Sequence, residues 1–175
     1  KLKAIVRYGV GYDNVDLEAA TRQQIKVSNV QGYANHSVSD HTLALIYACA
    51  RGLPQGQKSV KQQFGKPPIQ QILELHDKTL GIIGLGRIGG TLCQKAQPLF
   101  KKILASDPYI SNERFSSLGA SQTNLNNLLR ESDVISIHCN LTQETQGLID
   151  KNKMQLMRNG AIMINTARGD RKSVV

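Results

Sequence analysis

The stretch "TLGIIGLGRIG", residues 79–89, decides the fold of this 175-residue chain. Its first part, Thr79–Ile83, is an apolar run typical of a buried strand, and the rest carries three glycines in the pattern G-x-G-x-x-G. The pattern alone is weak evidence, but here it follows a predicted strand and opens a predicted helix, which is the context that dinucleotide binding requires. The stretch therefore predicts a strand, a tight glycine turn and a helix at a nucleotide site.

Each glycine of this turn has its own predicted role. Gly84 permits the tight turn, Gly86 lets a pyrophosphate approach the backbone, and Gly89 lets helix and strand pack closely. The free amide groups around Arg87 and Ile88 would face the phosphates at the start of the helix. The alternative is a glycine-rich strand-to-helix turn that binds no ligand.

Strands and helices alternate from this stretch to the end of the chain. The predicted strands are continuous apolar runs, which are typical of a parallel sheet covered on both faces. The fold class is therefore α/β with a doubly wound parallel sheet. Strands are predicted over residues 79–85, 102–107, 133–139 and 161–167, and helices over 87–97, 112–119, 124–132 and 150–160.

The N-terminal region carries a smaller strand, helix and strand, predicted over residues 2–9, 16–24 and 25–30. A long helix is predicted over residues 37–51, where Ser37 and Asp40 approximate a capping box. Residues 52–77 are rich in Gln, Lys, Gly and Pro, and this composition predicts a helix tail followed by a surface connection.

The second strand of the main alternation ends in "SDPY", which places Asp107 18 residues beyond Gly89. A carboxylate at this position can accept hydrogen bonds from the adenosine ribose hydroxyls. Its charge would repel a 2′-phosphate, and the nearest following arginine is Arg114, so NAD is favoured over NADP as the cofactor. An aspartate before a proline also forms turns and caps, and both roles can hold together.

Further polar residues follow the later strands: His138 and Cys139 end one, and Thr166, Ala167 and Arg168 follow the last. Ligands of an open parallel sheet bind beyond the carboxyl ends of its strands, so these residues fall on the cofactor edge. For His138 a hydrogen-bonded strand-end position with cofactor contact is favoured over catalysis, and for Cys139 a small residue near the adenine over a nucleophile. Arg168 could hold a carboxylate bidentately beside the nicotinamide; otherwise it is an ordinary exposed arginine.

Composition narrows the partners. The net charge is +9, from 22 Lys and Arg against 13 Asp and Glu, but aromatic residues are only 5% and no helix-turn-helix or aromatic RNA-binding motif is present. Scattered surface charge is therefore favoured over a nucleic-acid partner, although a basic chain would still attract anionic metabolites. The other histidines carry no marking neighbour and fit surface or capping positions; they are His36, His41 and His76.

The sequence also bears on the compartment. It has no apolar run of about 18 residues that could span a bilayer, and its start lacks the pattern of a signal peptide. Cys49, Cys93 and Cys139 are odd in number and lack CxxC spacing, which predicts neither a disulfide framework nor a zinc site. We expect a soluble, cytoplasmic protein without a metal or a membrane partner.

Several blocks of the sequence, in order, resemble the D-isomer-specific 2-hydroxyacid dehydrogenases, a family that includes phosphoglycerate dehydrogenases and C-terminal-binding corepressors. The blocks are "YGVGYDNVDLEAATR", "SVSDHTLAL", "KTLGIIGLGRIG", "SDPY", "IHCNLTQETQGLID" and "MRNGAIMINTARGD". The resemblance implies a Rossmann NAD-binding domain over residues 36–175, incomplete at its C-terminus. It also implies that residues 1–35 are the C-terminal remnant of a flavodoxin-like substrate domain.

The resemblance implies a role for individual residues as well. The backbone of Val10 and Gly11 would bind the substrate carboxylate, and Arg168 would orient the 2-oxo acid and polarise its carbonyl. In such enzymes a histidine paired with a carboxylate exchanges the hydroxyl proton while hydride moves to or from nicotinamide C4. The implied cofactor-binding residues are Gly84, Gly86, Arg87, Ile88, Gly89, Asp107, His138, Cys139, Thr166, Ala167 and Arg168.

Three departures from the family pattern bear on function. Asn140 stands where the family usually has proline, and the resemblance to the substrate domain starts at one of its last strands, so we expect its N-terminal half to be missing. The family's catalytic histidine and acidic partner would follow the "NTARG" loop, where residues 171–175 do not resemble the family. We therefore expect an NAD-binding fragment of an oxidoreductase acting on D-2-hydroxyacids, impaired in proton transfer. A homodimer is one assembly that it could form. The alternatives are an NAD-sensing, corepressor-like interaction module and an inactive remnant.

Overall fold

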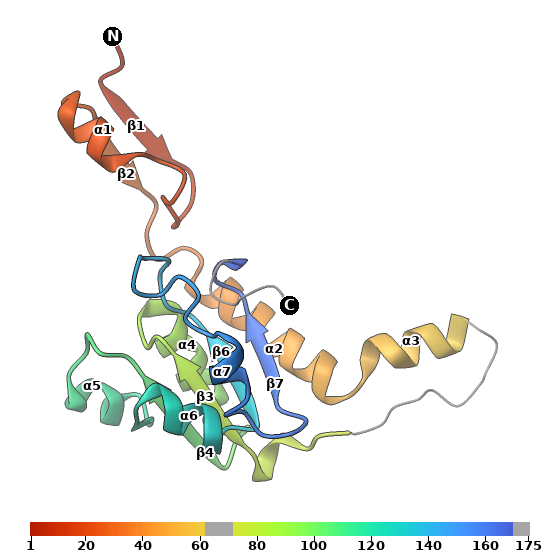
Figure 1. Cartoon of the computed structure of the whole chain (residues 1–175). Coiled ribbons are helices and arrows are strands. Elements are labelled where there is room, and N and C mark those ends of the chain that lie inside the picture. Colours follow the sequence, from red (N-terminus) through yellow and green to blue (C-terminus); the bar gives the residue numbers. More distant parts are fainter. Residues whose placement is uncertain (62–71, 170–175) are drawn as a thin grey trace.

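The structure is a computed structural model that describes residues 1–61 and 72–169 (Figure 1). In chain order its elements are β1 (Ala4–Arg7), α1 (Leu17–Arg22), β2 (Lys26–Asn29), α2 (Asn35–Ala50), α3 (Leu53–Lys61), the 3-10 helix η1 (Leu75–Asp77), β3 (Thr79–Ile83), α4 (Arg87–Ala96), β4 (Lys102–Ser106), α5 (Asn112–Ser117), β5 (Ser121–Gln122), α6 (Leu125–Glu131), β6 (Val134–Ile137), α7 (Lys151–Met154) and β7 (Ile162–Asn165).

The main sheet has five parallel strands in the order β5-β4-β3-β6-β7. Within this sheet the first strand of the chain is the central β3, and the next two, β4 and β5, lie on one side of it. The chain then returns to the other side of β3 for β6 and β7. This reversal makes the sheet doubly wound, so the predicted fold class is confirmed. It also places a topological switch point between β3 and β6, where open α/β sheets bind their ligands.

Alternate residues of the central strands pack on opposite faces of the sheet. Leu80 and Ile82 of β3 join the core beneath α2 and α4, whereas Ile83 joins a second core beneath α6 and α7. Gly81 faces the second core, where an added Cβ would lie 2.6 Å from Leu128 Cδ2 and 2.3 Å from Ser132 Oγ. The glycine therefore allows α6 to approach β3 closely.

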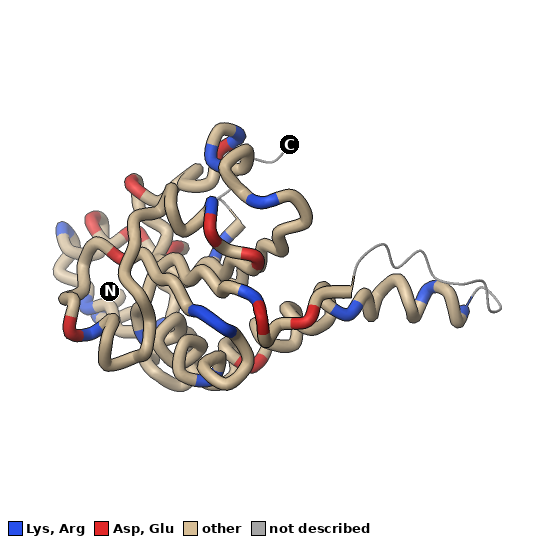
Figure 2. Tube along the Cα trace, turned by 90° about the horizontal axis from the view of Figure 1, so that it is seen from below, with Lys and Arg blue, Asp and Glu red and all other residues tan. Residues whose placement is uncertain are grey.

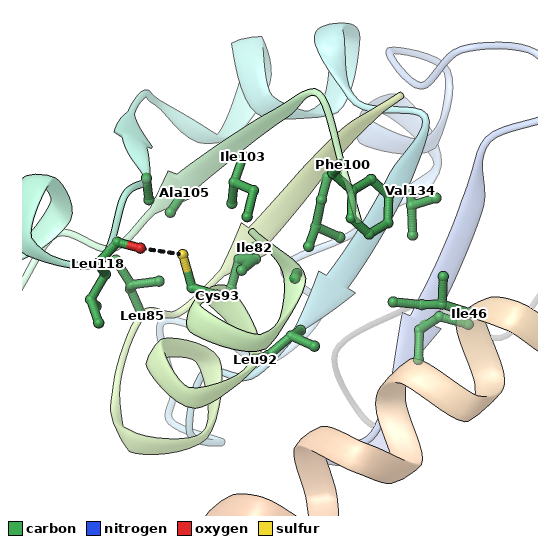
Figure 3. Close-up of a cluster of buried hydrophobic side chains, with 14 of the residues drawn as sticks. Ile46, Ile82, Leu85, Leu92, Cys93, Phe100, Ile103, Ala105, Leu118 and Val134 are labelled. Carbon is green, nitrogen blue, oxygen red and sulfur yellow. Dashed lines mark hydrogen bonds between the residues drawn. The ribbon is translucent and has the colours of Figure 1, made fainter. Parts of the chain in front are cut away.

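The larger core fills the space between the sheet and the helices α2 and α4 (Figure 3). Ile46 of α2 and Leu92 and Cys93 of α4 are fully buried there. The Cys93 thiol donates to the backbone oxygen of Leu118 at 3.2 Å, and burial raises the pKa of this thiol. Cys93 is thus an inert packing residue that joins α4 to the end of α5.

The N-terminal unit, β1–α1–β2, lies apart from the main sheet (Figure 1). Its two strands are parallel, with Ala4 opposite Lys26 and Arg7 opposite Asn29. The Asp16 side chain caps α1 by accepting from Ala19 N at 2.8 Å. Among residues 4–29 only Gly9 and Ala20 are buried, so the unit has little core of its own.

Some predicted boundaries were wrong. Helix α2 begins at Asn35, not Ser37, and its N-cap Ala34 makes no side-chain cap bond, so the predicted capping box does not form. Instead the Ser37 hydroxyl donates to Ala34 O, and Asp40 pairs with Lys95 of α4. Helix α7 covers only four residues of the predicted 150–160, and strand β5 was not predicted.

Other predictions fall partly beyond the described residues. Within residues 52–77 the structure has α3 and η1, but the predicted surface connection falls mainly on residues 62–71, which lie outside the described part, as does the unusual end, 171–175. Among the described residues no helix is long and apolar enough to cross a membrane. In the described part of the chain, lysines and arginines are spread along the trace, and acidic residues lie among them (Figure 2).

Candidate functional site

The predicted site residues meet at the carboxyl edge of the main sheet. Residues Gly84–Gly89 follow β3, Asp107 follows β4, His138 and Cys139 follow β6, and Thr166–Arg168 follow β7. Two backbone bonds fix the central turn there: Gly84 N donates to Ser106 O at 2.9 Å, and His138 N donates to Ile83 O at 2.7 Å. The fold thus brings together four segments that are up to 84 residues apart in the sequence.

The three glycines of the turn occupy three different environments. Gly84 has a φ of +88°, and an added Cβ would lie 2.6 Å from Cys139 N, so both conformation and packing require glycine. A Cβ on Gly89 would lie 2.1 Å from Gly84 O, so this glycine lets α4 begin directly above β3. A Cβ on Gly86 would meet no protein atom within 4 Å. Space is therefore open above Gly86, where a pyrophosphate would approach the backbone.

Arg87 reaches from the first turn of α4 to the segment that joins β2 to α2. Its Nη1 donates to Gln31 Oε1 at 2.5 Å, and Gln31 Nε2 donates to Asn29 Oδ1 at 3.4 Å. Asn29 Nδ2 in turn donates to the backbone oxygen of Val10 at 2.8 Å. A chain of hydrogen bonds therefore connects the glycine turn to the loop after β1.

The Asp107 carboxylate accepts hydrogen bonds from two backbone N–H groups, one in the glycine turn and one in its own loop. Its Oδ2 accepts from Leu85 N at 2.8 Å, and its Oδ1 accepts from Tyr109 N at 3.0 Å. The turn role that the sequence allowed is therefore present. Two hydrogen bonds do not exhaust the acceptor capacity of a carboxylate, so the side chain can still accept from a ribose hydroxyl.

His138 is partly buried at the end of β6, where its Nε2 lies 2.7 Å from Ser136 Oγ. Burial lowers the pKa of His138 from 6.5 to about 4. The imidazole is therefore neutral near pH 7, and protonating it there is unfavourable. A neutral, hydrogen-bonded ring agrees with the strand-end position favoured from the sequence.

Arg168 points from the loop after β7 to the loop after β1. Its Nε lies 3.1 Å from Asp13 Oδ1 and 3.0 Å from Oδ2, and its Nη2 lies 2.8 Å from Oδ1. This bidentate pair lowers the pKa of Asp13 through the hydrogen bonds and raises the pKa of Arg168. The guanidinium lies directly over Gly11, because a Cβ on Gly11 would be 1.8 Å from Nη2. Arg168 and Gly11 are thus adjacent.

The loop that carries Arg168 is fixed by polar contacts on both sides. Asn165 Oδ1 accepts from Ala167 N at 3.0 Å, and Asn165 Nδ2 donates to Arg168 O at 2.7 Å. Thr166 Oγ1 lies 3.1 Å from Oγ1 of the buried Thr42 in α2. A groove of about 440 Å³ runs beside this loop; it is lined by Ser37, Val38, His41 and Leu45 of α2 and by residues 165–169.

Several residues of this edge were not predicted. Asn165 carries a local signal, because asparagine often bonds to backbone two residues on. Asp13 and Gln31 carry none, since their partners lie 155 and 56 residues away. His41, expected at a surface or capping position, lines the groove beside the Arg168 loop. In residues 1–61 and 72–169 no cluster of His, Cys, Asp or Glu could hold a metal ion.

Comparison with known proteins gives this edge a context. Residues 43–172 match the family model described as D-isomer specific 2-hydroxyacid dehydrogenase, NAD binding domain. A D-3-phosphoglycerate dehydrogenase of Archaeoglobus fulgidus is 42% identical over 168 residues, and a glyoxylate reductase of Thermococcus litoralis is 39% identical over 176 residues. The chain also superposes on the crystal structure of D-lactate dehydrogenase from Aquifex aeolicus complexed with NAD and lactic acid, with a TM-score of 0.89 and 35% identity.

The matches cover nearly all of this chain but only part of each relative. The alignments include 96% of the chain and 32% of the phosphoglycerate dehydrogenase, and 97% of the chain and 53% of the glyoxylate reductase. For the lactate dehydrogenase the shares are 98% and 51%. The chain thus spans about a third to a half of the length of these relatives.

Proposed function

The chain belongs to the D-isomer-specific 2-hydroxyacid dehydrogenase family and carries its NAD-binding domain, and from this we propose that it takes part in hydride transfer between NAD and a small 2-hydroxy or 2-oxo acid. One observation carries the proposal: the open backbone at Gly86 and the guanidinium of Arg168 beside Gly11 lie on the same edge of the sheet. The first suits a dinucleotide and the second suits a carboxylate.

The glycine turn fits the pyrophosphate of NAD in the proposed complex. The backbone of Gly84, Gly86 and Gly89 shapes the turn, and the amides of Arg87 and Ile88 lie at the start of a ten-residue helix, where backbone N–H groups favour an anion. Asp107 would accept from the ribose hydroxyls and disfavour a 2′-phosphate, so NAD is proposed over NADP. His138, Cys139, Thr166 and Ala167 would line the nucleotide from β6 and β7.

The acid would bind between the two loops that Arg168 connects. Val10 and Gly11 would bind its carboxylate through their backbone, while the guanidinium of Arg168 orients the acid and polarises the carbonyl. NAD, when bound, supplies or accepts the hydride. We also propose residues 1–35 and 36–175 as two domains, which places this acid site at their boundary.

Proton transfer to or from the acid would require a histidine with a carboxylate partner, and the described residues supply no such pair near Arg168. His138 is neutral near pH 7, and His41, on the groove beside Arg168, has no acidic partner among the described residues. The one histidine–carboxylate pair of the described part, His76 with Glu74 at 3.7 Å, lies before β3 and far from the carboxyl edge. Loss of a general acid typically lowers a rate by about 100- to 10,000-fold, so we propose slow turnover by this chain.

Calorimetry with NADH and NADPH tests the cofactor. We expect NADH to bind, NADPH to bind more weakly, and Gly86→Val to abolish binding, because its side chain would fill the open space above the turn. Gly56→Val is the matched control, since a Cβ on Gly56 of α3 also meets nothing within 4 Å but lies away from the turn. No NADH binding, or equal binding by Gly86→Val, would contradict the proposal.

Turnover is measured separately, by following NADH absorbance with glyoxylate, hydroxypyruvate and pyruvate. We expect slow oxidation of NADH with at least one of these acids, and rapid turnover would refute the proposed impairment.

Two copies of the chain are proposed to pair through the helices that enter the nucleotide domain. Tyr47 of α2 and Leu53 and Val60 of α3 expose apolar surface, with 40%, 58% and 64% of each residue accessible. Sedimentation velocity of wild type and of Leu53→Asp/Val60→Asp tests this, and a monomeric wild type would contradict it.

A cytoplasmic location is part of the same proposal, because Cys49, Cys93 and Cys139 form no disulfide.

A further inference from the structure

The pair between Asp13 and Arg168 joins the loop after β1 to the loop after β7. Asp13 lies two residues beyond Gly11, and its carboxylate takes the edge of the guanidinium formed by Nε and Nη2, at 2.8 to 3.1 Å. Both side chains remain partly exposed, 43% for Asp13 and 41% for Arg168, so the pair lies open to a small solute.

Asp13 leaves part of the guanidinium available. Arginine has five N–H donors; here Nε and one N–H of Nη2 face Asp13, and one N–H of Nη1 donates to Ala167 O at 2.9 Å. One N–H on each terminal nitrogen, Nη1 and Nη2, therefore has no partner among the described residues. Nη1 and Nη2 together form the end of the guanidinium, and this end can bind two oxygens of one ligand.

Backbone on both sides of Arg168 fits the observed position of its guanidinium. Nη2 lies where a side chain on Gly11 would be, so the guanidinium rests against the loop proposed to bind the acid. Asn165 braces the other side by bonding to both Ala167 N and Arg168 O. The backbone of Arg168 is thus fixed by Asn165, and its side chain by Asp13.

We propose that Asp13 is a positioning residue for Arg168: it holds the Nε edge of the guanidinium and presents the Nη1–Nη2 end to the carboxylate and carbonyl oxygens of a 2-oxo acid. This inference rests on the proposed function, because it assigns the acid to the same arginine. It adds a residue that makes no contact with the acid itself and acts through Arg168.

Asp13 has two effects that an experiment must separate. Its hydrogen bonds restrict a flexible side chain before the acid binds, which favours binding by about 3- to 10-fold. Its negative charge lies near the place of the acid's carboxylate and opposes binding. Asp13→Asn removes the charge but keeps an acceptor oxygen, whereas Asp13→Ala removes both. Comparison of these two variants therefore measures the positioning effect at constant charge.

The test is calorimetric titration of the NADH-loaded chain with oxamate, a 2-oxo acid analogue whose amide carbonyl is not reduced. We expect Asp13→Ala to bind oxamate about 3- to 10-fold more weakly than Asp13→Asn, while both variants bind NADH like wild type. Glu18→Ala is the control, because it removes an exposed acidic residue of the same unit, one that pairs with the exposed Arg22. It should leave oxamate affinity within about twofold of wild type.

Each outcome decides one question. Equal or tighter oxamate binding by Asp13→Ala than by Asp13→Asn would overturn the inference, as would NADH binding without oxamate binding in wild type. Absence of NADH binding in wild type would instead overturn the proposed function, and the inference with it.

A second readout is ¹⁵N NMR of the Arg168 Nε–H, identified by its loss in Arg168→Lys. The proton should exchange slowly in wild type and rapidly in Asp13→Ala; equal exchange would show that Asp13 does not hold the guanidinium.

Discussion

Two parallel β-α-β units of this chain have the same connectivity and opposite degrees of burial. In β3–α4–β4 the side chains of Leu80, Ile82 and Leu92 are wholly buried. In β1–α1–β2 the exposed fractions of Val6 and Leu17 are 74% and 42%. The first unit lies inside a five-stranded sheet with helices on both faces, and the second forms a sheet of two strands.

The difference shows that the β-α-β pattern specifies connectivity but not burial. Burial is supplied by neighbours: β3 pairs with β4 and β6, and α2 packs against α4, whereas β1 pairs only with β2 among the described residues. A two-stranded sheet alone is marginally stable in water. The N-terminal unit therefore depends on polar links such as Asp13–Arg168, and four experiments probe this contrast.

The largest effect is expected from matched leucines in the two crossover helices. Leu92→Ala in α4 removes a fully buried side chain and should lower the free energy of unfolding by about 2–5 kcal/mol. Leu17→Ala in α1 removes a half-exposed one and should cost less than about 0.5 kcal/mol. Urea denaturation followed by circular dichroism measures both. Similar losses for the two variants would mean that the N-terminal unit is buried in solution.

The second experiment uses pH, because His138 lies in the main sheet and residues 1–35 contain no histidine. Burial depresses the pKa of His138 in the folded state from 6.5 to about 4. The unfolded chain then binds a proton more readily, so stability is full above pH 6.5 and falls as the pH drops toward 4. The expected loss is about 3 kcal/mol.

The stability of the N-terminal unit should fall only at a lower pH than that of the main sheet. The pKa of Asp13 is lowered from 3.8, so the stability that its pair with Arg168 contributes is kept above that value and lost below it. Urea unfolding at several pH values between pH 7 and about pH 2 checks the order, because this range spans both transitions. His138→Asn is the variant that cannot take up the proton. If that variant keeps the full pH dependence, another group is responsible for the acid sensitivity.

The sequence predicted what depends on neighbouring residues. The glycine turn was predictable because Gly84, Gly86 and Gly89 are a local pattern with a conformational reason, and the buried strands because they are continuous apolar runs. The doubly wound parallel sheet, with ligands at the carboxyl ends of its strands, then followed from the alternation of strands and helices.

What depends on distant neighbours could not be predicted. The pair of Asp13 and Arg168 joins positions 155 residues apart. The capping box does not form because α2 begins at Asn35, two residues before Ser37, and Asp40 instead bonds to Lys95 Nζ of α4 at 2.6 Å. Helix α7 ends early because Leu156 and Met157 donate three residues back, to Lys153 O and Met154 O, and this tighter turn leads into β7.

A third experiment compares ion pairs. Asp133 accepts from Thr79 N at 2.9 Å and from Arg158 Nη1 at 2.9 Å, and its side chain is 20% exposed. Asp133→Ala leaves a backbone N–H at the start of β3 without its acceptor and should cost about 1–3 kcal/mol. Glu18 of α1 is 91% exposed and pairs with Arg22 at 3.8 Å, so Glu18→Ala should have almost no effect. Equal costs in chemical denaturation would contradict the contrast in burial.

The smallest effect is expected at Gln31, in the segment between the two units. Its Oε1 accepts from Arg87, the residue whose amide and side chain lie at the proposed pyrophosphate site. If Gln31 competes with the pyrophosphate for this guanidinium, Gln31→Ala should tighten NADH binding by up to about threefold, the size expected for one exposed hydrogen bond. The same change should speed hydrogen exchange of the β1 and β2 amides, because the N-terminal unit loses one of its links to the glycine turn. Gln57→Ala in α3 is the matched control, since that exposed glutamine lies away from both units. Weaker NADH binding by Gln31→Ala would instead show that Gln31 orients Arg87 toward the pyrophosphate, and the two units would then cooperate in holding the nucleotide.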